Sequence, residues 1–236
     1  QDKLLATERY EAWESVARKL AHEIKNPLTP IQLSIDRLRE KYSKKIGSES
    51  NDFEKYLETI NRQIKDIENL VNEFSSFARM PRPIFKQINI VDIVNRSADL
   101  IKMTSKNKNN IKATEKKLMI NGDANQLNRV FINLIKNSEE AFQDIKEKTP
   151  DFKGKIDIEI ISNNDYIVIR LTDNGTGISD TKKVMTPYFT TKTKGTGLGL
   201  PIVSKIINEH SGDFLIKNKK NGKGILIDIS FPQINA

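Results

Sequence analysis

Residues 21–30 read Ala-His-Glu-Ile-Lys-Asn-Pro-Leu-Thr-Pro. This stretch contains His22, one of only two histidines in 236 residues. Apolar residues recur in steps of three and four along it, which predicts a helix with one apolar seam. The residues of this seam are Ile24, Leu28, Ile31, Ile35, Leu38 and Tyr42. His22 precedes Ile24 by two residues, about 200° round a helix, so the pattern places the imidazole on the solvent side.

A carboxylate and an amide accompany the histidine on this helix. Glu23 follows His22 directly, which is typical of a nucleophile with its orienting partner. Asn26, four residues on, lies over the same face. A histidine on a helix surface is, on its own, most often only a surface residue. Pro27 and Pro30, however, each remove a backbone hydrogen bond, at about 3 kcal/mol apiece, which predicts a bend or weak point just after His22.

The composition is that of an ordinary soluble protein, with 30% charged and 37% hydrophobic residues. The absence of cysteine excludes disulfides and thiolate metal sites. No apolar run approaches the ~18 residues of a membrane span, and no signal peptide opens the chain. Because the first residue is Gln1 rather than methionine, we expect the chain to be a piece of a longer protein.

The formal net charge of +8 comes mainly from scattered lysines. These lysines lack the interleaved aromatic residues of a nucleic-acid platform, so we expect no nucleic-acid partner. A solvated surface is the favoured reading, and a basic surface would also suit a partner with an acidic active site.

The N-terminal region is predicted to be a helical hairpin. One helix runs from Lys3 to about Lys44, residues 45–52 form a turn, and a second helix runs from Phe53 to about Ala78. The second helix has an unbroken heptad seam of Phe53, Leu57, Ile60, Ile64, Ile67, Val71 and Phe74. A lone hairpin buries little apolar surface, so two copies are expected to pair as a four-helix bundle. The alternative is that the hairpin packs on the rest of its own chain.

Prolines at positions 81 and 83 predict a linker, because proline disfavours helix at and before itself. We therefore expect a helical domain at 1–80, a linker at 81–87 and a second domain at 88–236. The predicted helices of the second domain are 90–105, 123–143 and 198–210. Its predicted strands are 111–114, 118–120, 154–162, 166–172, 213–218 and 224–231. This order predicts a sheet covered by helices on one side, an α+β sandwich.

Two segments of the second domain carry side chains suited to a nucleotide. Asn133 and Asn137 lie four apart on one predicted helix, with Lys136 beside them. Amide oxygens can ligate Mg²⁺, and lysine supplies a point charge for phosphate. Asp173-Asn174-Gly175-Thr176-Gly177 directly follows a strand. Its carboxylate can accept a hydrogen bond from an adenine amino group, and its glycines let the backbone pass close to a base.

Two further segments follow, at residues 186–192 and 194–200. Lys194-Gly195-Thr196-Gly197-Leu198-Gly199-Leu200 opens a helix and supplies unhindered backbone N–H groups for a phosphate. Lys192 and Lys194 add positive charge. The polar stretch from Asp180 to Gly197 is interpreted as a lid over the nucleotide, with an ordinary surface loop as the alternative. A Rossmann site is disfavoured, because these glycines do not follow the first strand of a βαβ unit.

Together the four segments resemble the N, G1, F and G2 boxes of the ATP-binding domain shared by histidine kinases, gyrase-type topoisomerases, Hsp90 chaperones and MutL proteins. The hairpin with His22 resembles the dimerisation and histidine-phosphotransfer domain of two-component sensor histidine kinases. Residues 21–33 and 194–200 look most like the nitrogen-regulation, NtrY-like group. Thr186 stands where that family usually has an acidic residue, and Pro201 where alanine is common. Neither is expected to abolish ATP binding.

The resemblance implies a Mg²⁺- and ATP-dependent kinase that phosphorylates His22 with Glu23 as orienting carboxylate. The phosphoryl group would then pass to an aspartate on the receiver domain of a response regulator, and Asn26 could orient water to remove it from that phosphoaspartate, a second, phosphatase activity. The implied nucleotide-binding residues are Asn133, Lys136, Asn137, Asp173, Gly175, Gly177, Thr191, Lys192, Lys194, Gly195, Thr196, Gly197, Leu198 and Gly199, with Asn133 and Asn137 as Mg²⁺ ligands. The chain is expected to be the cytoplasmic portion of a bacterial inner-membrane sensor, homodimeric through the hairpin, with membrane contact only through segments outside it.

Two other functions are compatible with parts of the sequence. A gyrase- or chaperone-type ATPase would hydrolyse ATP without a phosphohistidine. Resemblance to those proteins calls for a general-base glutamate four residues before Asn137, where this chain has Asn133. A non-catalytic dimeric scaffold is disfavoured by the presence of His22, Glu23 and all four nucleotide segments.

Overall fold

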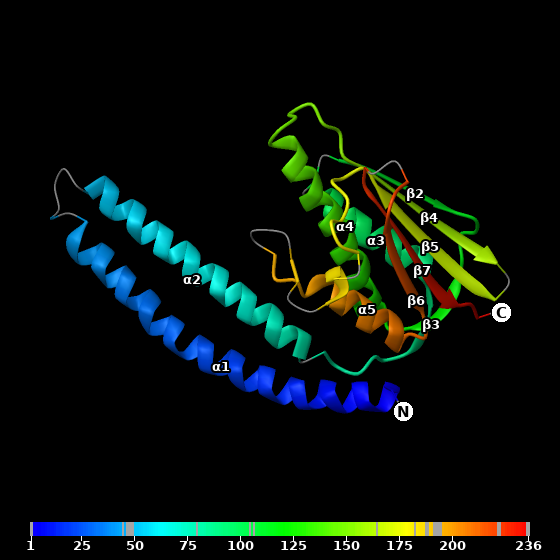
Figure 1. The fold of residues 1–236 in the computed structure, drawn as a ribbon, viewed down its shortest axis with the longest axis horizontal. Helices are drawn as coiled ribbons and strands as arrows, with labels where there is room; N and C mark the ends of the chain where they lie inside the picture. The colour runs from blue at the N-terminus through cyan, green and yellow to red at the C-terminus, as the bar shows by residue number, and fades with distance from the viewer. Residues whose placement is uncertain are drawn as a thin grey trace. The chain divides into compact units, whose positions relative to one another are not determined.

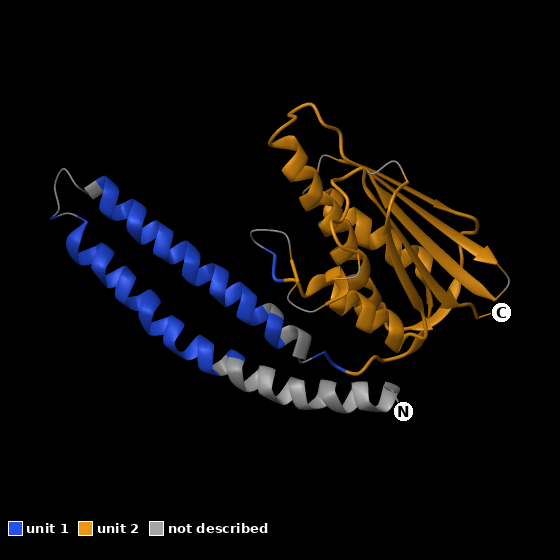
Figure 2. Ribbon diagram, in the orientation of Figure 1, with its two compact units in different colours: residues 1–81, 192–196 blue, residues 82–191, 197–236 orange. Residues whose placement is uncertain are grey.

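The computed structural model describes residues 2–43, 45, 50–78, 80–103, 105, 107–163, 165–181, 183–186, 189–190, 195–220 and 223–234, without the side chains of residues 2–20, 22, 50, 73 and 76–78. The chain forms two compact units, residues 1–81 with 192–196 and residues 82–191 with 197–236 (Figure 2). The first consists of two long helices, and the second combines helices with two sheets (Figure 1). Within the described residues, no helix has both the length and the apolar character needed to cross a membrane.

The helices α1 (Asp2–Tyr42) and α2 (Ser50–Ala78) form the predicted hairpin. α1 continues through both prolines and does not end at either of them. Only every second residue of the predicted seams is buried in the core between the two helices. This buried cluster consists of Leu28, Ile35, Leu57 and Ile64, with Phe53 packed against it. The alternate seam residues Ile24, Ile31, Leu38, Ile60 and Ile67 are 38–45% exposed. Each helix therefore carries a buried stripe and, beside it, an exposed apolar stripe.

Polar contacts that the sequence did not reveal fix the register of the two helices. The Gln32 amide donates to Asn61 Oδ1 at 2.9 Å between the apolar layers. Nearer the turn, Arg39 Nε pairs with Glu54 Oε2 at 3.1 Å, and the Ser43 hydroxyl donates to the same carboxylate. A helix slipped by one turn would break these pairs, so they favour a single alignment.

The second unit is built on a five-stranded sheet in the order β2-β4-β5-β7-β6. Its strands are β2 (Lys108–Ala113), β4 (Lys155–Asn163), β5 (Tyr166–Asp173), β6 (Asp213–Asn218) and β7 (Ile225–Pro232). β2 pairs with β4 in parallel, and the other pairs are antiparallel. In β4, β5 and β7 alternate isoleucines and leucines are buried, as expected for a sheet with one covered face.

Three helices cover that face of the sheet (Figure 1). They are α3 (Ile90–Lys102), α4 (Ala124–Lys146) and α5 (Gly199–Glu209), and a short 3₁₀ turn, η2 (Lys183–Met185), precedes α5. The uncovered face carries ion pairs, such as Arg170 Nε with Asp228 Oδ1 at 2.7 Å. The sandwich is thus the one that the sequence predicts.

Two details differ from the sequence expectation. The strand β1 (Lys86–Asn89) was not predicted, and it pairs with β3 (Met119–Gly122) in a separate two-stranded sheet. Ile88 is its only apolar residue, so the strand is too short to show an alternating pattern. The predicted strands at 111–114 and 118–120 consequently belong to different sheets. The predicted helix 90–105 ends earlier, at Lys102.

The second histidine, His210, is structural. It ends α5 and is only 4% exposed. Its Nε2 accepts the Asp123 backbone N–H at 2.9 Å, and its Nδ1 donates to the Ile206 carbonyl at 2.8 Å. These partners assign a neutral ring with its proton on Nδ1. Burial lowers the pKa of His210. The Ile206 carbonyl and the Asp123 carboxylate raise it by less, so the pKa is lowered overall.

The stability of the second unit should therefore fall on mild acidification. The lowered pKa of His210 means that the unfolded chain, with a histidine pKa near 6.5, takes up the proton first. The contribution of neutral His210 to the free energy of unfolding is complete above about pH 6.5. It is lost as the pH falls towards the pKa of His210 in the folded protein, by at most about 1.4 kcal/mol per pH unit. Urea unfolding between about pH 7.5 and 5.5 should show this slope, and His210→Gln, which cannot titrate, should flatten it. Equal slopes in the two proteins would contradict the assignment.

Candidate functional site

Three of the four predicted nucleotide segments meet around α4. Asp173, at the end of β5, accepts a hydrogen bond from Ser138 on this helix. A Cβ placed on Gly175 would lie 3.0 Å from the Cβ of Ala141, also on α4. At the start of α5, a Cβ placed on Gly199 would lie 3.9 Å from Asn137 Nδ2. The segments at 133–141, 173–177 and 197–199 therefore line one region of the second unit.

Asp173 is held rigidly, with only 3% of its surface exposed. Its Oδ1 accepts the backbone N–H groups of Gly175 at 3.0 Å and Ile225 at 3.1 Å. Its Oδ2 accepts the Ser138 hydroxyl at 2.7 Å. A carboxylate offers about four acceptor positions, so one remains on Oδ2 after these three bonds. A fixed acceptor of this kind fits the exocyclic amino group of adenine.

The hairpin of β6 and β7 positions the loop after Asp173, which sequence reasoning did not detect. Asn218 Oδ1 accepts the Ile178 N–H at 2.8 Å, and its Nδ2 donates to the Ile178 carbonyl at 2.7 Å. Gly224 has φ +84°, and a Cβ there would lie 2.0 Å from the Asp173 carbonyl oxygen, so only glycine fits. In the sequence, the Gly-x-Gly run at 222–224 was the one indication that the backbone at Gly224 lies close to Asp173.

α4 presents the two predicted asparagines one turn apart. Asp123 caps the helix, accepting the N–H groups of Asn125 and Gln126. Burial raises the pKa of Asp123, but the N–H donors of Ile84, Gln126 and Asn125 outweigh this effect and lower it overall. Asn133 and Asn137 are half-buried further along the helix.

Lys136 lies beside the asparagines on the exposed side of α4. Its Nζ is 3.9 Å from Glu140 Oε1, and the Lys136 side chain is 61% exposed whereas that of Glu140 is 37% exposed. An ion pair of this exposure is weak, so the ammonium group can be redirected to a phosphate at little cost. The position thus agrees with the phosphate-binding role predicted for this lysine.

The start of α5 has the features of a phosphate-binding helix N-terminus. Leu198 occupies the N-cap position and has no side-chain oxygen with which to cap the first turn. Gly197 has φ +68°, a conformation that favours glycine. Pro201 lies in the first turn of α5, where its missing N–H is tolerated, so this departure from the family pattern leaves the helix intact.

The structure describes only some of the other predicted site residues. On α1, Glu23 and Asn26 are exposed and Ala21 is buried. Gly195 and Thr196 are half-buried. The side chain of His22 and the residues Thr191, Lys192 and Lys194 lie outside the described residues.

No cluster of three or more histidine and acidic side chains suited to a metal ion occurs in the part of the chain that the structure describes. The ligands that the sequence predicts for a cation are the amide oxygens of Asn133 and Asn137 on α4. Mg²⁺ commonly takes few protein ligands when a nucleotide supplies phosphate oxygens, so such a sparse set is compatible with it.

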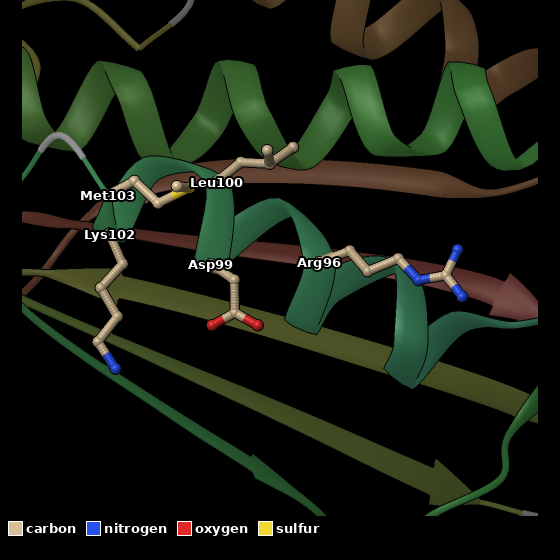
Figure 3. Close-up of a pocket in the computed structure, with 5 residues that line it drawn as sticks. All are labelled: Arg96, Asp99, Leu100, Lys102 and Met103. Atoms are coloured by element: carbon tan, nitrogen blue, oxygen red, sulfur yellow. The ribbon is translucent and has the colours of Figure 1, made fainter.

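A separate pocket of about 600 Å³ lies at the end of α3 (Figure 3). Its described lining consists of Arg96, Asp99, Leu100, Lys102 and Met103. In Figure 3, Leu100 and Met103 point away from the side on which Asp99 and Lys102 project. None of these described lining residues is a predicted nucleotide residue.

Comparison with known families covers both units. Residues 122–234 match the family described as histidine kinase-, DNA gyrase B-, and HSP90-like ATPase. Residues 12–83 match the His Kinase A (phospho-acceptor) domain. The matches confirm the predicted resemblance and the predicted order of a helical phosphoacceptor region followed by an ATP-binding sandwich.

Individual relatives give the same result. The nitrogen regulation protein NtrY of Azorhizobium caulinodans is 36% identical over 231 residues, covering 96% of this chain and 30% of that protein. An NtrY-like sensor histidine kinase of Rickettsia conorii is 40% identical over 238 residues, covering 98% of this chain and 38% of that protein. The chain thus spans about a third of the length of these curated relatives.

Among solved structures, the histidine kinase ThkA in complex with the response regulator protein TrrA aligns over 97% of this chain and 64% of that chain. The TM-score is 0.64 and the sequence identity 22%, a likeness of fold.

Proposed function

Because this chain belongs to the sensor histidine kinases of two-component systems, we propose that it transfers the γ-phosphoryl group of ATP to His22. The neutral imidazole would attack phosphorus through Nε2, forming a nitrogen–phosphorus bond as the bond to the β-phosphate oxygen breaks and ADP leaves. Glu23 would hold the proton on Nδ1 and stabilise the positive ring.

The observation that carries this proposal is the acceptor geometry at Asp173. A buried carboxylate with three fixed donors and one remaining acceptor position is a site for an adenine amino group. Asn137 and the start of α5, brought together beside it, would bind the phosphates, with Lys136, Lys192 and Lys194 adding charge. Mg²⁺ would be held by Asn133 and Asn137 and would neutralise charge on the phosphates.

Incubation with γ-labelled ATP and Mg²⁺ tests the proposal. A phosphohistidine is labile in acid and stable in base, so protein-bound label with this behaviour is expected. Release of phosphate without any protein-bound label would indicate an ATPase of the gyrase or chaperone type instead. ATP binding with neither product would indicate a scaffold.

The exposed apolar stripe of the hairpin supports a homodimer as the working form. Five seam residues at heptad spacing on both helices lack a covering surface within the hairpin itself. A second copy of the same hairpin would cover them with the same heptad pattern, forming a four-helix bundle. The match of residues 12–83 to the His Kinase A domain supports the same assembly.

Ile31→Glu should therefore convert the dimer to a monomer, because it would place a charge at the centre of the bundle. Leu33→Glu is the matched control. Leu33 is 54% exposed, close to the 45% of Ile31, but lies about 200° away round the same helix. Sedimentation at several concentrations should show a change of mass only for Ile31→Glu. A dimer that persists in this variant would contradict the proposed interface.

The proposed acceptor of the phosphoryl group is an aspartate on the receiver domain of a response regulator. The complex of ThkA with TrrA shows that a kinase of this fold binds such a protein. Asn26, exposed one turn after His22, would orient water for hydrolysis of the phosphoaspartate on the regulator. Because ATP is the substrate, the reaction is proposed to take place in the cytoplasm.

A further inference from the structure

We propose that Ser138 is a specificity-determining positioning residue, which makes the nucleotide site select a base with an amino group at C6. The inference rests on the proposed function, because it concerns the base that Asp173 would bind. Ser138 was not among the residues that the sequence singled out. It follows Asn137 on α4 and is 1% exposed.

The direction of the Ser138 hydroxyl is set by its two neighbours. Its Oγ is 2.7 Å from Asp173 Oδ2 but 3.4 Å from the Leu134 carbonyl oxygen on the same helix. The shorter contact has the usual length of an O–H···O hydrogen bond, whereas the longer one lies beyond the usual range. The single hydroxyl proton therefore goes to Asp173 and not to the helix backbone.

Ser138 is the side chain that binds the Asp173 oxygen proposed to face the base. Both backbone donors, Gly175 and Ile225, bind Asp173 Oδ1. Among the described side chains, Ser138 is the one with a hydrogen bond to Oδ2. Without it, Oδ2 would be a buried carboxylate oxygen with no side-chain donor to hold its position.

The pair presents only acceptors to a ligand. Because the Ser138 hydroxyl donates its proton to Asp173, the serine oxygen can only accept a further hydrogen bond. Asp173 Oδ2 also has one acceptor position remaining. An amino group at C6 of a purine can donate to this pair. A carbonyl oxygen at the same position would meet acceptors and be repelled, which gives selection for adenine over hypoxanthine.

The test compares the affinities of ADP and inosine diphosphate, which differ at C6. Calorimetric titration is expected to show at least a tenfold loss of ADP affinity in Ser138→Ala and less than a threefold loss for inosine diphosphate. Ser138→Thr, which retains the hydroxyl, should keep the wild-type ratio of the two affinities. Ser138→Cys is similar in size to the wild type but has a weak hydrogen-bond donor, so it should bring the affinities for ADP and inosine diphosphate closer together. This variant provides the test if Ser138→Ala does not fold.

Ser97→Ala is the control for the loss of a buried hydroxyl. Ser97 lies on α3 and is fully buried, and its hydroxyl oxygen lies within hydrogen-bond distance of the Ile93 carbonyl and of Asn128 Oδ1. Its removal should leave the ratio of the two affinities unchanged. Proportional losses for both nucleotides in Ser138→Ala and Ser138→Cys would overturn the inference and leave Ser138 a structural residue. A wild-type protein that binds neither nucleotide would overturn the proposed function instead.

Discussion

His22→Gln should abolish the transfer of label from γ-labelled ATP to the protein. Glutamine has no ring nitrogen that can attack phosphorus, so the loss is expected to be complete within detection, with no partial rate remaining. The substitution lies in the helical unit, whereas all the predicted nucleotide residues lie in the C-terminal part of the chain. ADP affinity should consequently be unchanged, which separates loss of the acceptor from loss of the nucleotide.

The other histidine supplies a matched control for this experiment. His210→Gln makes the same chemical change at a buried position that ends α5. Measured near pH 8, where His210 is neutral in the folded and unfolded protein, this variant should retain the label. Label that survives in His22→Gln would show that another residue accepts the phosphoryl group.

Asp173→Asn should reduce ADP affinity by about 100-fold or more. The asparagine oxygen can keep the two backbone bonds that Oδ1 now accepts, so the loop should stay in place. The amide nitrogen would then replace Oδ2 and point a donor at the donor of adenine. Phosphorylation of His22 should be lost together with binding.

Asp144→Asn provides the comparison for this charge change. Asp144 is an exposed carboxylate on α4, away from the residues that bind Asp173. The Asp144→Asn variant should bind ADP with wild-type affinity. Thermal melting should show that the wild type and both variants are folded. An Asp173→Asn protein that is folded and binds ADP as tightly as the wild type would contradict the proposed adenine contact.

The parts of the fold that the sequence predicted are those with a local pattern. Heptad spacing revealed α1 and α2, alternating isoleucines revealed β4, β5 and β7, and Asp123 marked the start of α4. The same spacing could not separate the two stripes of the hairpin. Ile31 and Ile35 look alike in sequence, yet Ile35 packs within the hairpin and Ile31 does not. Which stripe faces which partner depends on how the two helices pack, not on the period.

The missed parts of the site depend on contacts between distant segments. Ser138 reaches Asp173 across 35 residues, and Asn218 reaches Ile178 across 40. Neither serine on a helix nor asparagine at a strand end has a distinctive local signal. Strand pairing brings Asn218 into place, since β6 pairs with β7 and β7 pairs with β5, whereas packing of α4 against the end of β5 brings Ser138 to Asp173. The motif residues were therefore predictable, but not the residues that hold them.

The most direct measurement is the position of the phosphoryl group itself. The protein is phosphorylated with ATP and Mg²⁺, digested with trypsin at alkaline pH, where phosphohistidine survives, and analysed by tandem mass spectrometry. Cleavage after Lys19 and Lys25 releases residues 20–25, a peptide with His22 as its only histidine. One phosphate on His22, with the His210 peptide unmodified, is the predicted result. Phosphate on any other residue, with residues 20–25 unmodified, would contradict His22 as the phosphoacceptor.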